Sequence, residues 1–117
     1  MSELILAVDD NERILGVLKV ILDREGFLVI TAGNGHEALA KIKSEAPSLV
    51  LLDISLPDIS GVKLLEDIRR ISAVPVILLS GLTEVGRSIE RHASVRFVAK
   101  PFHPADLVEE VRLALQK

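Results

Sequence analysis

Three carboxylates follow apolar runs of the sequence in a way that would bring them together. Asp9 and Asp10 come directly after the run 4–8, and Asp53 comes directly after the run 49–52. Runs without polar alternation are typical of strands that are buried on both faces of a parallel sheet. Open sheets of this kind place their ligands at the carboxyl ends of the strands. If the two strands are neighbours, the three acids lie in one crevice.

Two further polar residues follow apolar runs in the same way. Ser80 comes after the run 74–79, and Lys100 comes after the run 95–99. Taken singly, each residue has an ordinary explanation, such as a helix cap or turn for an aspartate, a loop hydroxyl for the serine and a solvated amine for the lysine. The common position at strand ends is what favours a shared site.

The residue types predict the chemistry of this site. Carboxylates about 4 Å apart, in an effective dielectric near 20, repel by several kcal/mol per pair and need a cation between them. Oxygen ligands without sulfur or imidazole suit a hard ion such as Mg²⁺, which keeps waters and binds phosphate oxygens. An ammonium and a hydroxyl opposite the ion suit a transferred phosphoryl group, and aspartate can accept such a group. We therefore expect Mg²⁺-assisted phosphoryl transfer to a carboxylate.

Strands and helices alternate along the chain in our prediction. The expected strands are 4–8, 27–30, 49–53, 74–79 and 95–99. The first helix begins at a cap formed by Asp9, Asp10 or Asn11 and ends near residue 25. The later helices are expected at 36–45, 62–71, 84–93 and 104–115. Five strands, five helices and short connections predict an α/β fold with a doubly wound parallel sheet.

Length and composition exclude several classes of protein. A chain of 117 residues with 49% hydrophobic and 26% charged residues predicts one globular domain, 1–117. The absence of cysteine excludes disulfides, zinc–thiolate sites and thiol catalysis. A net charge of −3 gives no reason to expect direct binding to nucleic acid. No apolar run approaches the roughly 20 residues of a membrane span, and no signal segment is evident, so we expect a cytoplasmic protein without membrane insertion.

The whole set of residues resembles the receiver domain of two-component response regulators. The matching motifs are Asp9-Asp10, Asp53, Ser80 and Lys100-Pro101-Phe102, with Leu56-Pro57 and Gly61 after the central aspartate. The similarity covers essentially the whole chain. It implies a flavodoxin-like three-layer sandwich with strand order 2-1-3-4-5.

The resemblance implies how the acids act. Asp53 would be the phosphoacceptor, and its donor would be a sensor histidine kinase, a histidine phosphotransfer protein or a small acyl phosphate. Mg²⁺ would be bound by Asp9, Asp10, Asp53 and the backbone carbonyl of Ser55. The chain would then be a signalling phosphoacceptor that catalyses only its own phosphorylation and dephosphorylation, and not an enzyme with a separate substrate.

The resemblance also implies how the signal leaves the site. Lys100 would pair with the phosphoryl oxygens, and Ser80 would donate a hydrogen bond to one of them. Phe97 would be a switch aromatic that moves with Ser80, although from the sequence alone ordinary core packing is the stronger interpretation of this residue. The peptide bond between Lys100 and Pro101 would be cis. The switched surface would lie around the fourth helix, the fifth strand and the fifth helix.

Three features depart from the family's pattern. The segment between Ser80 and the fifth strand is shorter than usual, and Ala93-Ser94 replaces the expected Gly-Ala pair. Arg96 stands at a position that is often acidic in transcription-factor members. These departures leave the chemistry intact, but they leave the output partner and any family-typical dimer open.

Other functions are weighed against this one. A flavodoxin-like carrier of a nucleotide or flavin phosphate wants a Gly/Ser/Thr-rich turn after the first strand, whereas Asp9-Asp10-Asn11-Glu12 would repel phosphate. The intact acid set argues against a pseudo-receiver that acts as a constitutive adaptor. A hydrolase with Asp9 as nucleophile is disfavoured because the acids are adjacent and not spaced as Asp-x-Asp. No helix-turn-helix or enzymatic output domain follows within the sequence, so a stand-alone receiver and the receiver of a larger protein both stay open.

Overall fold

A five-stranded parallel sheet forms the centre of the molecule. The computed structural model describes residues 3–53, 56–80 and 95–116, with only the backbone of Ser80. The strands are β1 (Leu4–Val8), β2 (Leu28–Ala32), β3 (Leu49–Asp53), β4 (Val76–Ser80) and β5 (Val95–Ala99). They pair in the order β2-β1-β3-β4-β5, all parallel. The predicted strand order is confirmed.

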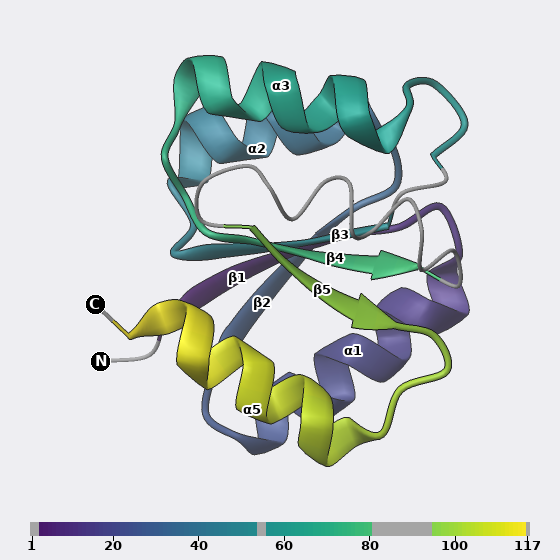
Figure 1. Ribbon diagram of the computed structural model, residues 1–117, viewed down its shortest axis with the longest axis vertical. Helices are drawn as coiled ribbons and strands as arrows, with labels where there is room; N and C mark the ends of the chain where they lie inside the picture. The colour runs from purple at the N-terminus through teal and green to yellow at the C-terminus, as the bar shows by residue number, and fades with distance from the viewer. Residues whose placement is uncertain (1–2, 54–55, 81–94, 117) are drawn as a thin grey trace.

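Helices cover both faces of the sheet (Figure 1). Those described are α1 (Glu12–Arg24), α2 (Gly35–Glu45), α3 (Gly61–Ile71) and α5 (Pro104–Leu115). In Figure 1, α2 and α3 lie together on one face, and α1 and α5 lie on the other. The predicted doubly wound sandwich is therefore confirmed, while the predicted helix 84–93 falls outside the described residues. None of the described helices has the length and apolar character needed to cross a membrane.

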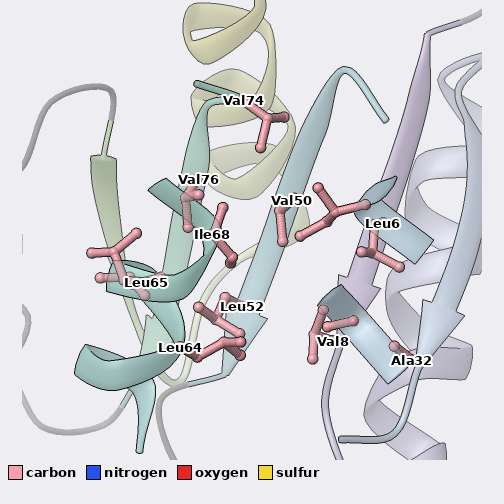
Figure 2. Packing of buried hydrophobic residues seen from close by; sticks show 13 residues of the cluster. Leu6, Val8, Ala32, Val50, Leu52, Leu64, Leu65, Ile68, Val74 and Val76 are labelled. Atoms are coloured by element: carbon pink, nitrogen blue, oxygen red, sulfur yellow. The ribbon is translucent and has the colours of Figure 1, made fainter. Parts of the chain in front are cut away.

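The buried strands explain the apolar runs. All five residues of β3 are buried, and β1 and β4 are almost entirely so. Successive side chains of a strand point to opposite faces, and each face here meets a helix layer. Leu6 and Val8 pack with α2 and α3 in the cluster that Figure 2 shows, whereas Ile5 and Ala7 pack with α1 and α5. The two apolar clusters fix the register of the strands, and with it the places where the strands end.

Two strands, β2 and β4, differ from the prediction at both ends. β2 begins at Leu28 and not at 27, because Phe27 N donates to the carbonyl of Leu22 of α1 at 3.1 Å and not to a neighbouring strand. It extends to Ala32, whose carbonyl accepts a hydrogen bond from Asp9 N at 3.0 Å. β4 begins at Val76, two residues later than predicted, because Pro75 has no N–H to donate to a neighbouring strand.

A lysine contacts the backbone of the edge strand β2. Lys41 of α2 donates a hydrogen bond from Nζ to the carbonyl of Thr31. The same ammonium lies 3.9 Å from Glu37 Oε1, one turn earlier on the helix. The outer side of β2 is thus tied to the helix that covers it.

Candidate functional site

The three acids meet where β1 and β3 end. β1 pairs with β3, and Val8 is opposite Leu52, so the next residues, Asp9 and Asp53, leave the sheet side by side. One carboxylate oxygen from each of Asp9, Asp10 and Asp53 lies within 4.8 Å of the others. Asp9 and Asp53 are buried, while Asp10 is exposed. The structure therefore brings the predicted acids together in one cluster.

Asp9 is not used as a helix cap. The cap of α1 is Asn11, whose side chain accepts hydrogen bonds from Arg13 N at 2.9 Å and Ile14 N at 3.4 Å. Asp9 Oδ1 accepts from Asn11 N at 2.9 Å, and Asp9 Oδ2 is buried without a hydrogen-bond partner among the described residues. Burial raises the pKa of Asp9 above its usual range, and the nearby charge of Asp53 acts in the same direction. The hydrogen bond from Asn11 and the charge of Lys100 lower the pKa but do not offset the burial.

Lys100 supplies the positive charge of the site. It follows β5, and its peptide bond to Pro101 is cis. Its Nζ lies 3.6 Å from Asp9 Oδ2 and 3.5 Å from Asp53 Oδ1. The lysine thus reaches past the end of β4 to contact the acids of β1 and β3, which join the sheet on the far side of β4.

The cluster fits a hard divalent cation. Its ligands are carboxylate oxygens, one of which, Asp9 Oδ2, is buried and has no hydrogen-bond donor among the described residues. Three carboxylates lie within 4.8 Å of one another, and the Lys100 ammonium contacts two of them, Asp53 at 3.5 Å and Asp9 at 3.6 Å, so one lysine leaves negative charge unbalanced. A divalent ion with oxygen preference, such as Mg²⁺, would balance that charge.

The remaining predicted residues are placed only in part. Ser80 is the last residue of β4, opposite Ala99 of β5, but its side chain lies outside the described part, as does all of Ser55. Phe97 is opposite Leu78 and packs, partly buried, against the core cluster on the α2 and α3 side.

Arg96, one of the departures from the family pattern, forms an ion pair inside its own chain. Its Nη1 lies 3.3 Å from Glu110 Oε2 of α5, so the guanidinium links β5 to α5.

One residue near the site was not singled out by the sequence analysis. Asp58, in the loop between β3 and α3, accepts hydrogen bonds from Gly35 N at 2.9 Å and His36 N at 3.1 Å. Its Oδ2 also lies 2.6 Å from His36 Nδ1. The sequence predicted only a loop here, because the partners lie 22 and 23 residues earlier and no local pattern indicates the contact.

An apolar groove opens beside Lys100. Its lining includes Ile14, Val17 and Ile21 from α1, together with Phe102 and Pro104 after β5. Val17 is 53% exposed, so the groove offers apolar surface to solvent.

A family profile and similar proteins of known sequence both place the chain in one family. The profile of the response regulator receiver domain matches residues 5–112. The chain is 39% identical over 118 residues to the probable transcriptional regulator ycf27 of Pyropia yezoensis, covering 99% of this chain and 49% of that protein. It is 38% identical over 122 residues to the CpxR homolog of Haemophilus influenzae, a transcriptional regulatory protein, covering 100% of this chain and 52% of that one. The chain thus spans about half the length of the curated relatives it matches.

Solved structures agree with the sequence comparison. The receiver domain of NtrX from Brucella abortus superposes with a TM-score of 0.89 at 36% identity, over 95% of this chain and 97% of that one. A putative response regulator from Chloroflexus aurantiacus superposes with a TM-score of 0.91 at 29% identity, over the full length of both. Since the family profile spans nearly the whole chain, and the acids and lysine converge at one end of the sheet, the chain belongs to the receiver domains of two-component response regulators.

Proposed function

We propose that this chain accepts a phosphoryl group on Asp53 in a reaction that depends on Mg²⁺. One observation supports the proposal most directly: Lys100 Nζ lies within 3.6 Å of both Asp53 and Asp9, and Asp9 Oδ2 has no hydrogen-bond donor among the described residues. The donor would be a sensor histidine kinase or a histidine phosphotransfer protein. We further propose that residues 1–117 act as one receiver domain in the cytoplasm.

The proposed reaction follows from the positions of these groups. A carboxylate oxygen of Asp53 would form a bond to phosphorus while the bond from phosphorus to the donor breaks, and the donor atom would keep the electron pair. The Lys100 ammonium, already 3.5 Å from Asp53 Oδ1, would pair with the phosphoryl oxygens. Ser80 would donate a hydrogen bond to one of these oxygens. Bound Mg²⁺, with Asp9, Asp10, Asp53 and the carbonyl of Ser55 as ligands, would offset the negative charge of the transferred group.

The groove beside Lys100 supports a protein as donor. A kinase or phosphotransfer protein must bring its phosphorylated side chain to Asp53 while its own surface contacts the molecule nearby. Val17 and Ile21 of α1, with Phe102, offer apolar surface next to the lysine of the site. Burial of such surface is the main favourable term in most protein associations.

The proposed output is a change of surface around the fourth helix, β5 and α5. Phosphorylation would shift a two-state equilibrium through Ser80 and Phe97 and so change the affinity for an output domain or protein. Two of the matched relatives are described as transcriptional regulators and are about twice as long as this chain. An output segment or partner is therefore part of the proposal. Arg96 is engaged with Glu110, which limits its use between two copies of the chain.

The test is phosphorylation by a small donor. With acetyl phosphate and Mg²⁺, intact mass should show one added phosphoryl group, and Asp53→Asn should abolish it. Asp23→Asn is the matched control, since that carboxylate is exposed and pairs with Lys19 on the same helix. If Asp53→Asn is labelled at the wild-type rate, the acceptor is wrongly assigned.

A further inference from the structure

The loop after Asp53 is bound to the first turn of α2 by one side chain. Asp58 Oδ1 accepts from Gly35 N, and Oδ2 accepts from His36 N and contacts the His36 ring. α2 already has a cap of its own, because the Asn34 side chain accepts from Glu37 N at 2.8 Å. Asp58 therefore binds two other free N–H groups of the first turn, and it comes from a distant part of the chain.

The residue after Asp58, Ile59, packs against the start of α2. Gly35 is buried, and a Cβ added there would lie 2.2 Å from Ile59 Cγ2. Ile59 follows Asp58 and packs against the core cluster beneath α2 and α3. Ile59 thus occupies the space that a side chain at position 35 would need. The position of residues 58 and 59 therefore depends both on the hydrogen bonds of Asp58 and on the packing of Ile59 against Gly35.

The two segments that meet in these contacts are each connected to an acid of the cluster. Asp58 stands five residues after Asp53, and Ser55 lies between them. On the other side, Asp9 N donates to the carbonyl of Ala32, and the chain runs from there into α2. The N-terminus of α2 is therefore connected to Asp9 through β2 and to Asp53 through the loop.

We propose that Asp58 is a positioning residue for this site, which sets the affinity for the divalent ion by holding residues 58 and 59, which follow Asp53 in the sequence, against the start of α2. The inference rests on the proposed function, because it concerns the geometry of the same ion site. The hydrogen bond from Gly35, followed by that from His36, lowers the pKa of Asp58 to about 2, so the carboxylate stays charged at any pH at which the site would work.

The experiment measures Mg²⁺ dependence in matched variants. For wild type, Asp58→Ala and Asp58→Asn, Mg²⁺ is titrated directly by calorimetry and in acetyl phosphate labelling of Asp53. Asp67→Asn is the control, since that carboxylate lies 3.1 Å from Lys63 and 3.4 Å from Arg70, both on its own helix. Asp58→Ala should weaken Mg²⁺ binding about tenfold, the lower end for a residue that orients a metal ligand. The labelling rate at saturating Mg²⁺ should change by less than about twofold, since Asp58 does not touch the reacting atoms.

Asp58→Asn should lie between wild type and Asp58→Ala, because its amide keeps one acceptor oxygen. A second pair of variants covers the case in which Asp58→Ala does not fold. Gly35→Ala pushes on the loop from the other side, whereas a Cβ at Gly33 meets nothing within 4 Å. Gly35→Ala should weaken Mg²⁺ binding, and Gly33→Ala should not.

The failure of this inference and that of the proposed function can be told apart. Folded Asp58 and Gly35 variants that bind Mg²⁺ like wild type overturn the inference, whatever the labelling shows. The inference is also overturned if the Mg²⁺ affinity of these variants falls only in proportion to their thermal stability and falls equally in Asp67→Asn. A wild-type protein that binds Mg²⁺ but is not labelled refutes the proposed function, and the calorimetric comparison still decides the role of Asp58.

Discussion

Removing the charge of Asp9 should make the metal-free protein more stable, although Asp9 lies in the centre of the site. The carboxylate is buried, its Oδ2 has no hydrogen-bond partner among the described residues, and burial raises its pKa. Asparagine keeps an oxygen to accept from Asn11 N but has no charge. We therefore expect Asp9→Asn to raise the free energy of unfolding in the absence of divalent ions.

Burial is the largest cause of the raised pKa of Asp9, and the charges around Asp9 together act in the same direction. With an effective dielectric near 20, carboxylates 4.8 Å apart repel by about 3.5 kcal/mol, and Asp9 has two such neighbours, Asp10 and Asp53. The Lys100 ammonium, at 3.6 Å, attracts Asp9 by about 4.6 kcal/mol. Repulsion therefore exceeds attraction by roughly 2 kcal/mol, which solvent at the exposed Asp10 reduces to about 1–2 kcal/mol. In a domain of this size, that corresponds to an increase in Tm of about 4–8 °C.

The assay is a thermal melt with a chelator and again with Mg²⁺. Wild type should gain stability with the ion, by about 1.4 kcal/mol at ten times Kd, because only the folded state has the site. Asp9→Asn should gain less, since it has lost a ligand, so its advantage should shrink as Mg²⁺ is added.

Lowering the pH provides a second check of the same reasoning. The raised pKa means that ionised Asp9 destabilises the fold above that pKa. The advantage of Asp9→Asn should therefore disappear as the pH falls through the pKa and Asp9 becomes neutral. Asp23→Asn, an exposed and paired carboxylate, should change little in any condition. If Asp9→Asn is less stable than wild type in chelator, the attraction of Lys100 dominates and the account of the cluster is wrong.

Two further predictions concern residues at the rim of the site. Ser80→Ala should leave labelling of Asp53 largely intact, but it should reduce several-fold the gain in partner affinity on beryllofluoride activation, since coupling energies are typically about 1–3 kcal/mol. If Ser80→Ala and Phe97→Ala both keep the wild-type ratio of affinities, the signal takes another route and Phe97 is only part of the core. Hydrogen bonds lower the pKa of Asp58 from 3.8 to about 2, so the ionised carboxylate stabilises the fold fully above pH 3.8. This stabilisation is lost as the pH falls through the folded-state pKa of about 2. Urea unfolding between about pH 4 and 2 should therefore depend less on pH in Asp58→Asn, and a wild-type slope would contradict this.

Strands β1, β3 and β5 were predictable because their signal is local. The predicted ranges of β3 and β5 match the structure at both ends. Burial on both faces leaves no polar position in β3 until the carboxylate that ends it. The positions of Asp9, Asp53 and Lys100 then followed from the rule that parallel strands end at one edge.

Features that depend on distant residues were not predictable in the same way. The edge strand β2 is only partly buried, so its alternation is weak and the predicted range was displaced. The contact of Asp58 with Gly35 and His36 spans more than twenty residues, and an aspartate after proline predicts only a turn. The roles of Ser55 and Ser80 stay predictions, since one residue and the side chain of the other lie outside the described part.

The hydrogen bond from Lys41 to Thr31 bears on how two copies of the molecule can meet. A strand at the edge of a sheet offers backbone N–H and C=O groups with which a strand of another chain can pair. On β2, an ammonium from α2 already occupies the carbonyl of Thr31 and leaves positive charge at that edge. Two molecules that approached through β2 would bring these charges together and would have to break both hydrogen bonds before their strands could join. A continuous sheet across two copies is therefore disfavoured on this side, so the β2 edge is protected from edge-to-edge aggregation.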